Sequence, residues 1–366
     1  MTIPHCPNRK CSNFNHPDPK HQWYRKKGFE VRKLRGTIQR YQCKSCHRTF
    51  DLNYFSMDFY LHRKISYKSI FHSLITCSGI RDMARHFHCT TKVIQNRIRR
   101  LSQKIMILSS QIISQMELKE NLAADGLESF ILSQYFPSNI NILAGSRSQF
   151  IYYHNAYYFK RKGKTTREQK KKLKELYKEA FFEKGGASRA FRELLITLED
   201  LLDRSDLDQM ILDTDENPIY SGQFKAYGGL HSRVTHRLTN SKEERNQNNK
   251  LFPCNYIDRQ IRKDMAEHVR ETVQYARNMN PSMERFAIYR FWHNFMKPFR
   301  EKHRRKGYGL THGEVAGISR ERIMELVSRV MDGRRILLDP DEVPFTSFQR
   351  RVFDGELPNP LRKAAV

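Results

Sequence analysis

Apolar side chains in the middle of the chain fall into three short segments that follow one another. Residues 118–130, 139–144 and 150–154 are each apolar over a few residues and carry β-branched or aromatic side chains, which is typical of strands. The stretch from Gly145 to Ser148 separates the last two segments and has the composition of a hairpin turn. We therefore predict three successive antiparallel strands.

Helical and strand-like spacing alternate in the second half of the chain. Apolar residues at helical spacing over 188–202 predict an amphipathic helix, and Met210–Asp215 predicts a buried strand that ends in acids. A further strand is predicted over 231–238, and helices are predicted over 257–279 and 281–295. This mixture of strands and helices predicts an α/β domain. One more helix, over 319–331, precedes a polar tail that contains proline.

Residues 53–104 have a helical pattern that includes a helix-turn-helix over 80–101, in which Thr90 or Thr91 caps the second helix. His88 occupies the turn position at which Gly is usual. The second helix would expose five side chains that suit phosphates and base edges in a major groove: Lys92, Gln95, Asn96, Arg99 and Arg100. An ordinary basic helical hairpin is the alternative. Residues 105–117 predict a connecting helix.

The charge balance of the chain is strongly basic. Its 366 residues include 66 Lys and Arg against 39 Asp and Glu, which gives a formal net charge of +27. Such an excess favours a polyanionic partner, with nucleic acid first and an anionic membrane surface as the alternative. No stretch approaches the ~18 consecutive apolar residues of a membrane-spanning helix. The first residues lack an apolar signal region, so we expect a cytoplasmic protein.

Four of the seven cysteines form two pairs near the N-terminus. Cys6 and Cys11 make the first pair, and Cys43 and Cys46 make the second. Four thiolates satisfy tetrahedral Zn²⁺, so residues 1–52 predict a zinc ribbon in which the metal is structural. The spacing of the first pair is unusual, and His5 or His16 is an alternative ligand. Four unrelated free thiols are the other interpretation.

Two features between the predicted strands bear on function. Lys160 to Lys174 contains nine Lys and Arg and one acid, Glu168. This segment is either a solvated helix face or a surface that follows a DNA backbone.

Three acids also stand out, because Asp125 lies in the first strand, Asp215 at a strand end and Glu284 early in a late helix. Acids from such separate elements can share two Mg²⁺ ions for phosphodiester chemistry. Alternatively, Asp213 or Asp215 caps the following turn, and Glu284 is an ordinary N-terminal helix acid.

The three acid motifs together resemble those of a known enzyme family. The motifs are Asp125-Gly-Leu-Glu-Ser-Phe, Thr214-Asp-Glu-Asn-Pro-Ile-Tyr and Met283-Glu-Arg-Phe followed by His293-Asn-Phe. With the strand order, they are similar to the RNase H-like domain of DDE transposases, and the preceding cysteine pairs and helix-turn-helix resemble bacterial insertion-sequence transposases with a zinc ribbon. The resemblance covers roughly residues 4–300.

The resemblance implies a multidomain protein with a small zinc ribbon, an all-α helix-turn-helix and an α/β RNase H-like mixed sheet flanked by helices. The expected boundaries are 1–52 for the ribbon, 53–104 for the helix-turn-helix, 118–300 for the catalytic domain with a basic insertion at about 160–185, and 301–366 for a basic helical C-terminal tail.

The resemblance also implies a site and a reaction. Asp125, Asp215 and Glu284 become the ligands of Mg²⁺ or Mn²⁺, with Asp215 favoured over Asp213 and with three competing acids: Glu128, Glu267 and Glu271. The expected activity is DNA strand cleavage at element ends followed by strand transfer, by a homo-oligomer on DNA associated with the bacterial nucleoid. The alternatives are a zinc-dependent DNA-binding regulator without catalysis, a nuclease or resolvase of the same fold, and a tyrosine or serine recombinase.

Overall fold

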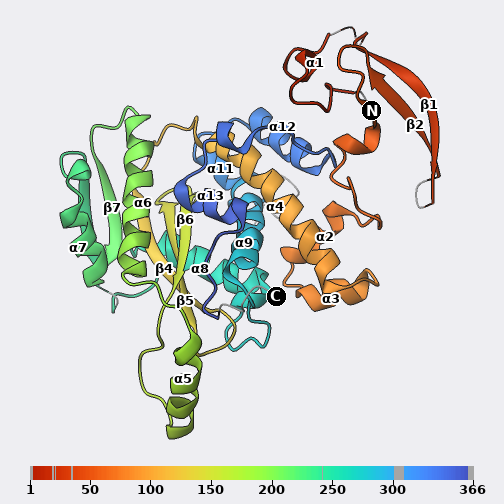
Figure 1. Cartoon of the computed structure of the whole chain (residues 1–366). Helices are drawn as coiled ribbons and strands as arrows, with labels where there is room; N and C mark the ends of the chain where they lie inside the picture. The colour runs from red at the N-terminus through yellow and green to blue at the C-terminus, as the bar shows by residue number, and fades with distance from the viewer. Residues whose placement is uncertain are drawn as a thin grey trace. The chain divides into compact units, whose positions relative to one another are not determined.

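The structure, a computed structural model, separates into two units (Figure 1). It describes residues 3–18, 20, 22–33, 36–240, 242–300 and 309–361. The first unit comprises Met1–Ser66 with Met331–Leu338, and the second comprises Tyr67–Val330 with Asp339–Val366. No helix among the described residues is long and apolar enough to span a membrane.

The first unit is built on a small antiparallel sheet, with the strand order β1-β2-β3. The strands are β1 (Tyr24–Arg32), β2 (Gly36–Cys43) and β3 (Thr49–Asp51), and the short helix α1 (Ser12–Asn15) precedes them. Trp23, Phe50 and Phe55 are buried beside three of the cysteines. Residues 331–338 return to this unit, where the backbone N–H of Arg335 donates to the carbonyl of Phe55 at 2.7 Å. A core with so few apolar side chains is too small to stabilise the fold of this unit by itself.

The second unit contains a five-stranded mixed sheet with the order β6-β5-β4-β7-β8. Its strands are β4 (Leu122–Phe130), β5 (Pro137–Gly145), β6 (Ile151–Tyr158), β7 (Met210–Asp215) and β8 (Val234–Thr239). β5 is antiparallel to β4 and β6, whereas β7 is parallel to β4 and to β8. The strand predictions are confirmed, with β8 starting a few residues later than expected.

Helices cover both faces of this sheet. In Figure 1, α6 (Gly186–Asp203) and α7 (Pro218–Ala226) lie on one side, and α8 (Phe252–Asp264) and α9 (Met279–Phe295) lie on the other. All nine residues of β5 are buried, as expected for a central strand enclosed from both sides. The helix predicted over 188–202 is α6, which buries its apolar face because Leu194, Leu195 and Leu198 share one side.

Three helices precede the sheet in the second unit: α2 (Tyr67–Leu74), α3 (Ile80–His86) and α4 (Thr91–Ile113). The turn between α3 and α4 contains His88 with a φ of 48°, the left-handed conformation that explains why Gly is usual there. The predicted connecting helix over 105–117 is mostly the second half of α4. Because α4 packs against α9, the helix-turn-helix belongs to the same compact unit as the sheet.

The helix predicted over 257–279 is wrong at both ends. The helix in this region, α8, begins at Phe252 and ends at Asp264, and a short 3₁₀ turn and irregular backbone lead to α9. Carbonyls of the region accept tertiary hydrogen bonds, from Cys77 N–H to the Asp264 carbonyl at 2.9 Å and from Leu132 N–H to the Ala276 carbonyl at 2.7 Å. Tertiary contacts therefore override the local helical pattern.

The predicted C-terminal tail is also corrected, within the described residues 309–361. This region contains α11 (His312–Val315), α12 (Arg320–Met331) and α13 (Ser347–Asp354). α13 buries Phe348 and Val352 against α4 and α9, so it belongs to the core. Two helical turns bring these side chains to one face of a segment that otherwise looks polar. The basic residues of 301–308 lie outside the described residues, as do residues 362–366.

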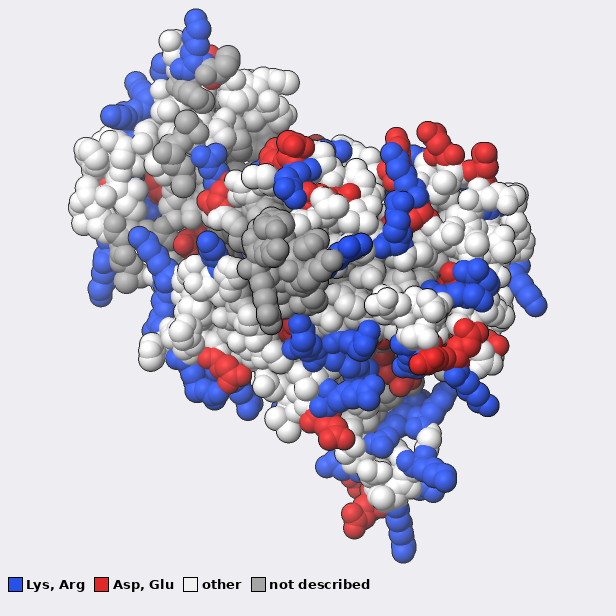
Figure 2. Space-filling view, turned by 180° about the vertical axis from the view of Figure 1, so that it is seen from behind, with Lys and Arg blue, Asp and Glu red and all other residues white. Residues whose placement is uncertain are grey.

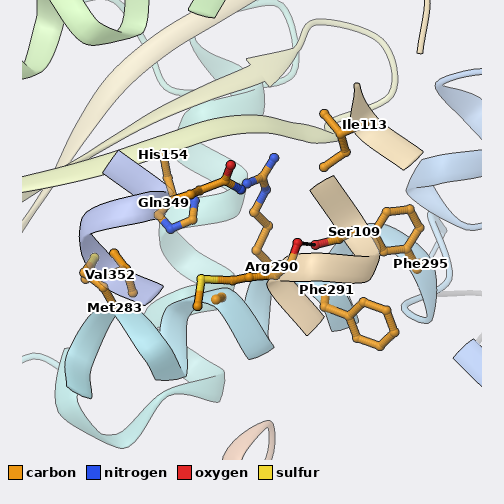
Figure 3. Close-up of a pocket in the computed structure, with 11 residues that line it drawn as sticks. Ser109, Ile113, His154, Met283, Arg290, Phe291, Phe295, Gln349 and Val352 are labelled. Carbon is orange, nitrogen blue, oxygen red and sulfur yellow. Dashed lines mark hydrogen bonds between the residues drawn. The ribbon is translucent and has the colours of Figure 1, made fainter. Parts of the chain in front are cut away.

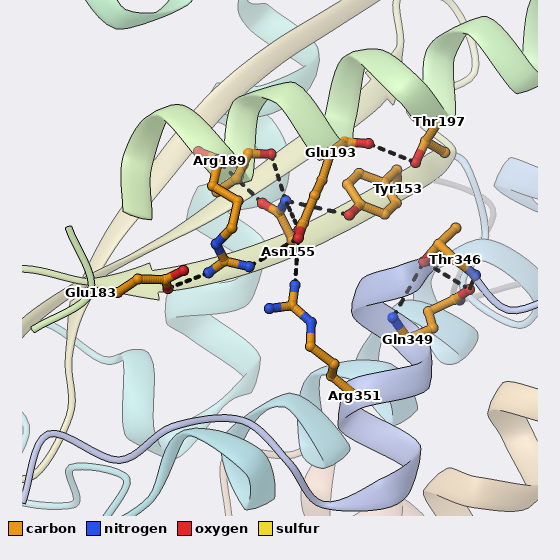
Figure 4. Close-up of polar contacts among 11 residues, drawn as sticks. Tyr153, Asn155, Glu183, Arg189, Glu193, Thr197, Thr346, Gln349 and Arg351 are labelled. Carbon is orange, nitrogen blue, oxygen red and sulfur yellow. Dashed lines mark hydrogen bonds and ion pairs between the residues drawn. The ribbon is translucent and has the colours of Figure 1, made fainter. Parts of the chain in front are cut away.

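α13 is also held by polar contacts (Figure 4). Glu193 on α6 accepts from Arg189 at 2.9 Å and from Arg351 on α13 at 2.6 Å. Asn155 on β6 donates to the same carboxylate at 3.2 Å. Half-buried charges with several partners are well compensated, so this network ties α13 to the sheet and to α6.

The space between α4, α9 and α13 is nearly filled (Figure 3). A cavity of about 10 Å³ remains there, beside Ser109, His154 and Arg290. Such a volume holds at most one water molecule. This cavity is therefore a packing defect of the core and not a functional site.

Candidate functional site

The four N-terminal cysteines converge in the first unit. Cys6 and Cys11 flank the loop before α1, Cys43 ends β2, and Cys46 lies in the turn before β3. Their sulfur atoms all lie within 4.8 Å of one another, and three of the four residues are buried. This arrangement is compatible with tetrahedral zinc, as the spacing predicted.

Burial and hydrogen bonding act in opposite directions on the thiols: burial raises the pKa of Cys6 and of Cys11, whereas hydrogen bonds from backbone N–H groups favour the thiolate. The backbone N–H of Asn8 donates to Cys6 Sγ at 3.4 Å, and Asn13 Nδ2 donates to Cys43 Sγ at 3.7 Å. Burial raises the pKa of Cys46, but hydrogen bonds from Arg48 and other neighbours outweigh it and lower the pKa to about 7. The His5 ring is hydrogen-bonded to the Cys6 carbonyl at 2.9 Å, so the four sulfurs suffice as a ligand set.

Strand register brings two of the three predicted acids together in the second unit. β4 and β7 pair in parallel, with Leu122 opposite Leu212 and Ala123 opposite Asp213. If the same register continues for two more residues along both strands, Asp125 lies beside Asp215. Neighbouring strands are about 4.8 Å apart, so the two carboxyl groups start from adjacent backbone positions.

The electrostatics of Asp125 reveal a third acid, Asp258 on α8. Burial raises the pKa of Asp125 to about 6, the N–H of Gly126 opposes that rise, and the charge of Asp215 adds to it. Burial and then the charge of Asp125 raise the pKa of Asp258 to about 7. Arg245, in the loop between β8 and α8, lowers the pKa of both Asp125 and Asp258. Three acids from β4, β7 and α8 therefore form one electrostatic cluster.

α8 carries Asp258 toward the sheet because of its spacing. Cys254, Ile257 and Ile261 are fully buried, and α8 packs against β4 and β5. Asp258 lies four residues after Cys254 and three before Ile261, so it shares their face. An acid on an otherwise apolar helix face is the sequence signal that could have identified Asp258.

Asp213 has a different role from Asp215. It is 2% exposed and accepts two hydrogen bonds from Arg237 on β8, at 2.5 and 2.9 Å. This bidentate pair uses both carboxylate oxygens. Asp215 instead accepts the backbone N–H of Asn217 at 3.1 Å through one oxygen, and burial raises its pKa. Both oxygens of Asp213 are therefore engaged by Arg237, whereas Asp215 accepts a described hydrogen bond through one oxygen.

Glu284 lies apart from the aspartates, on α9. It accepts from Asn280 Nδ2 at 3.1 Å, and Arg99 on α4 approaches it to 3.8 Å. Burial raises the pKa of Glu284 to about 7, and the groups that lower it are Arg99, Arg285 and Asn280. Neither Asp125 nor Asp215 is among the groups that influence it. Glu284 is therefore a buried acid of the interface between α4 and α9.

The competing acids do not join the aspartates either. Glu267 is bound by Arg285, and its other oxygen accepts from Ser282 at 2.9 Å. Glu128 has an exposed position on β4, and Glu271 lies in the irregular segment after α8 with a φ of 57°.

The aspartates are less closely assembled than the cysteines. Among the described residues, only the four cysteines bring three or more potential ligand atoms close enough to share an ion. Asp125 is coupled electrostatically to Asp215 and to Asp258, and a cation bound between the three acids would draw the oxygens together. The site is an acidic cluster with suitable hard donors rather than a preformed cage.

The predicted DNA-contacting face of α4 is largely exposed. Lys92, Gln95, Asn96 and Arg99 are exposed, whereas Arg100 is only half-buried. Ile94 and Ile98 on the opposite face are buried, whereas Phe87 and Cys89 in the turn are only partly buried. Arg99 keeps about half of its side-chain surface exposed (51%) even though it approaches Glu284, so it can still contact a ligand.

No protein-family model matches the chain, and no curated protein matches it in sequence.

Proposed function

We propose that the chain is an insertion-sequence transposase of the DDE class, which cuts DNA at element ends and joins the freed 3′ end to target DNA. The observation that carries this proposal is the cluster of Asp125, Asp215 and Asp258. Two adjacent parallel strands and one helix contribute one acid each, and no described ion pair neutralises any of the three. Phosphodiester chemistry uses such convergent acids.

The strand order supports an RNase H-like fold for the second unit. Three antiparallel strands are followed, after the helices α5 (Arg167–Glu179) and α6, by a fourth strand that pairs with the first, and a fifth strand extends the sheet beyond it. The helix that follows the fifth strand then carries the last acid. The proposal therefore replaces Glu284 by Asp258 as the third member of the triad.

The three carboxylates suit Mg²⁺ or Mn²⁺. Hard divalent cations prefer carboxylate oxygens, and a cluster of desolvated acids with raised pKa values is relieved when a cation neutralises it. When bound, such ions activate the attacking oxygen and stabilise the leaving oxygen.

The residues of the chain orient the ligand oxygens. Asp125 Oδ1 accepts the N–H of Gly126 at 2.7 Å, and Asp215 Oδ1 accepts the N–H of Asn217 at 3.1 Å. Each bond fixes a carboxylate plane and leaves Oδ2 for a cation. A Cβ at Gly126 would lie 2.3 Å from the side-chain amide of Asn139, so that amide would have to move if Gly126 were replaced. Arg245 supplies a positive charge near Asp125 and Asp258, where a DNA phosphate would lie.

DNA recognition falls to the N-terminal elements in this proposal. The exposed face of α4 reads the element ends, and the zinc-bound first unit adds a further DNA contact. A transposase must hold two ends together, so we expect a homo-oligomer on double-stranded DNA, located in the bacterial cytoplasm with the nucleoid.

The proposal is tested on a plasmid that carries the coding sequence with its natural flanks. With Mg²⁺ or Mn²⁺, the wild type should cut at the flanks, and Asp125→Asn, Asp215→Asn and Asp258→Asn should each lose cleavage while DNA binding persists. Glu284→Gln is the matched control, because it also removes one buried acid but should keep cleavage.

The outcomes separate the competing interpretations. Cleavage without joined products would favour a nuclease of the same fold. Metal-independent binding without any cleavage would favour a zinc-dependent DNA-binding regulator. If Glu284→Gln lost cleavage and Asp258→Asn kept it, the revised triad would be wrong and the original one restored.

A further inference from the structure

The connection between β6 and α6 forms a basic projection, here called the α5 arm (residues 160–185). It contains the helix α5 (Arg167–Glu179), in which no residue is fully buried. Residues 160–179 include ten Lys and Arg against three acids. In Figure 1, α5 projects beyond the end of the sheet, and Figure 2 shows Lys and Arg side chains over that projection. The projection is therefore a concentrated positive surface.

The positive charges of α5 are ordered along the helix. Arg167, Lys171, Lys174 and Lys178 are spaced by four, three and four residues, so they share one side of the helix. All four are exposed, and no ion pair among the described residues neutralises them. At 1.5 Å per residue the stripe is about 16 Å long. A straight basic stripe of this length matches a run of backbone phosphates.

The α5 arm is anchored, which an ordinary solvated helix does not require. The hydroxyl of Tyr177 donates to the Tyr135 carbonyl at 2.7 Å and accepts the N–H of Arg161 at 2.8 Å. The Tyr177 ring also packs edge-on against Phe182, at 4.8 Å between centroids, and lies 5.8 Å from Phe136. Thr166 and Gln169 form a capping box at the start of α5. The stripe thus has a defined place relative to the sheet.

Strand direction sets the base of the arm at the acidic end of the sheet. β4 and β6 both run antiparallel to β5, and β7 is parallel to β4. The carboxyl ends of β4, β6 and β7 therefore lie at one end of the sheet. Asp215 ends β7, and the arm starts two residues after Tyr158, the end of β6. Burial raises the pKa of Tyr157 on β6, and the charges of Glu128 and Asp215 add smaller contributions. The end of β6 therefore lies close enough to Asp215 to interact with its charge.

We propose that the α5 arm is an additional, sequence-independent DNA contact, whose stripe of Arg167, Lys171, Lys174 and Lys178 binds backbone phosphates of the duplex that enters the acidic site. This inference rests on the proposed function only in assuming that the bound duplex is the DNA that the acidic site cuts. Recognition of element ends remains with α4, and the arm fixes the duplex beside Asp125, Asp215 and Asp258.

The test is the salt dependence of binding to a labelled duplex of arbitrary sequence. The arm variant combines Arg167→Gln, Lys171→Gln, Lys174→Gln and Lys178→Gln, and Gln is as good a helix former as Lys. The matched control removes four exposed cations elsewhere in the second unit, through Lys119→Gln, Arg192→Gln, Lys225→Gln and Arg329→Gln. Both variants have the same net charge, so general electrostatics is equal in the two.

Each phosphate contact contributes about 0.9 to the slope of log affinity against log salt. The arm variant should therefore lose about 3 to 4 from that slope between about 50 and 200 mM salt, and the control should lose less than about 1. Equal slopes in the two variants would overturn the proposal, and so would a wild type that binds no duplex.

The same proteins separate the two proposals. If the arm variant loses slope but the wild type never cleaves with metal, the arm contact stands and the transposase function fails. If the wild type cleaves and the arm variant keeps its slope, the function stands and the arm contact fails. Capture of RNA but not duplex DNA by the wild type would also refute the arm contact as stated.

Discussion

The protonation of Glu284 should make folding of the second unit depend on pH. The residue is 5% exposed, and burial raises its pKa from 4.5 to about 7, although Arg99 and Arg285 partly oppose the rise. A carboxyl whose pKa is higher in the folded state binds its proton more tightly there. Well below pH 4.5 the residue is protonated in both states, so its ionisation does not lower the free energy of unfolding. As pH rises through the folded pKa, the loss of unfolding free energy grows.

The size of the effect follows from the two pKa values. Each pKa unit corresponds to about 1.4 kcal/mol, so the rise from 4.5 to about 7 costs the folded state about 3 kcal/mol above pH 8. At pH 5 the cost is only about 1 kcal/mol, because most folded molecules are still protonated. Glu284→Gln removes the ionisable group, so its stability relative to the wild type should improve by about 2 kcal/mol between pH 5 and pH 8.

The assay is urea unfolding followed by tryptophan fluorescence. The chain has two tryptophans, Trp23 in the first unit and Trp292 on α9, so a Trp23→Phe background leaves one reporter on the same helix as Glu284. Glu325→Gln on α12 is the control, because that side chain is 70% exposed and its removal should show little pH dependence. A gain for Glu284→Gln that stays constant or shrinks as pH rises would refute the reasoning.

Three further outcomes test other parts of the structure. Removing zinc with a chelator, or Cys43→Ser, should unfold the first unit and leave the second folded, as two separate unfolding transitions in calorimetry; full zinc occupancy in the variant would contradict the four-cysteine site. Asp213→Ala should destabilise the second unit by about 1–3 kcal/mol in urea unfolding, because Arg237 loses its bidentate partner, and Arg237→Ala should do the same; no change in either variant would show that the pair is not structural. Phe348→Ala should cost about 3–5 kcal/mol, since the ring is 1% exposed between α13 and its neighbours; a loss below about 1 kcal/mol would mean that the C-terminal segment is a tail after all.

Local patterns were sufficient for the elements that are stabilised by their own spacing. The five strands of the sheet and α6 were all predicted, because alternation or a continuous apolar run marks a strand and a three-to-four spacing marks a helix. His88 was singled out from its turn position alone, and its φ of 48° confirms the reason. The cysteine pairs likewise predicted a cluster that the structure brings together.

Prediction was poorest where a segment is shaped by contacts distant in sequence. The region 265–278 is not α-helical, although its composition suits a helix; within it the Ala276 carbonyl accepts a hydrogen bond from the distant Leu132 N–H. α13 looked like part of a polar tail, yet two buried side chains and the bond between Arg351 and Glu193 bind it to the core. Such contacts leave no periodic trace in a short segment.

The sequence by itself determined which residues carry useful chemistry and which elements hold them, because donor type and local periodicity are properties of neighbouring residues. It was sufficient for the four cysteines, for Asp215 at the end of its strand and for the basic content of the α5 arm. Only the tertiary structure decided which acids meet. The register of β4 with β7 sets Asp125 beside Asp215, and α8 places Asp258 close enough to Asp125 to interact with its charge. α9 packs on α4, so Glu284 lies near Arg99 instead. Convergence depends on strand pairing and helix orientation, and these are set by burial of the whole core rather than by any one motif.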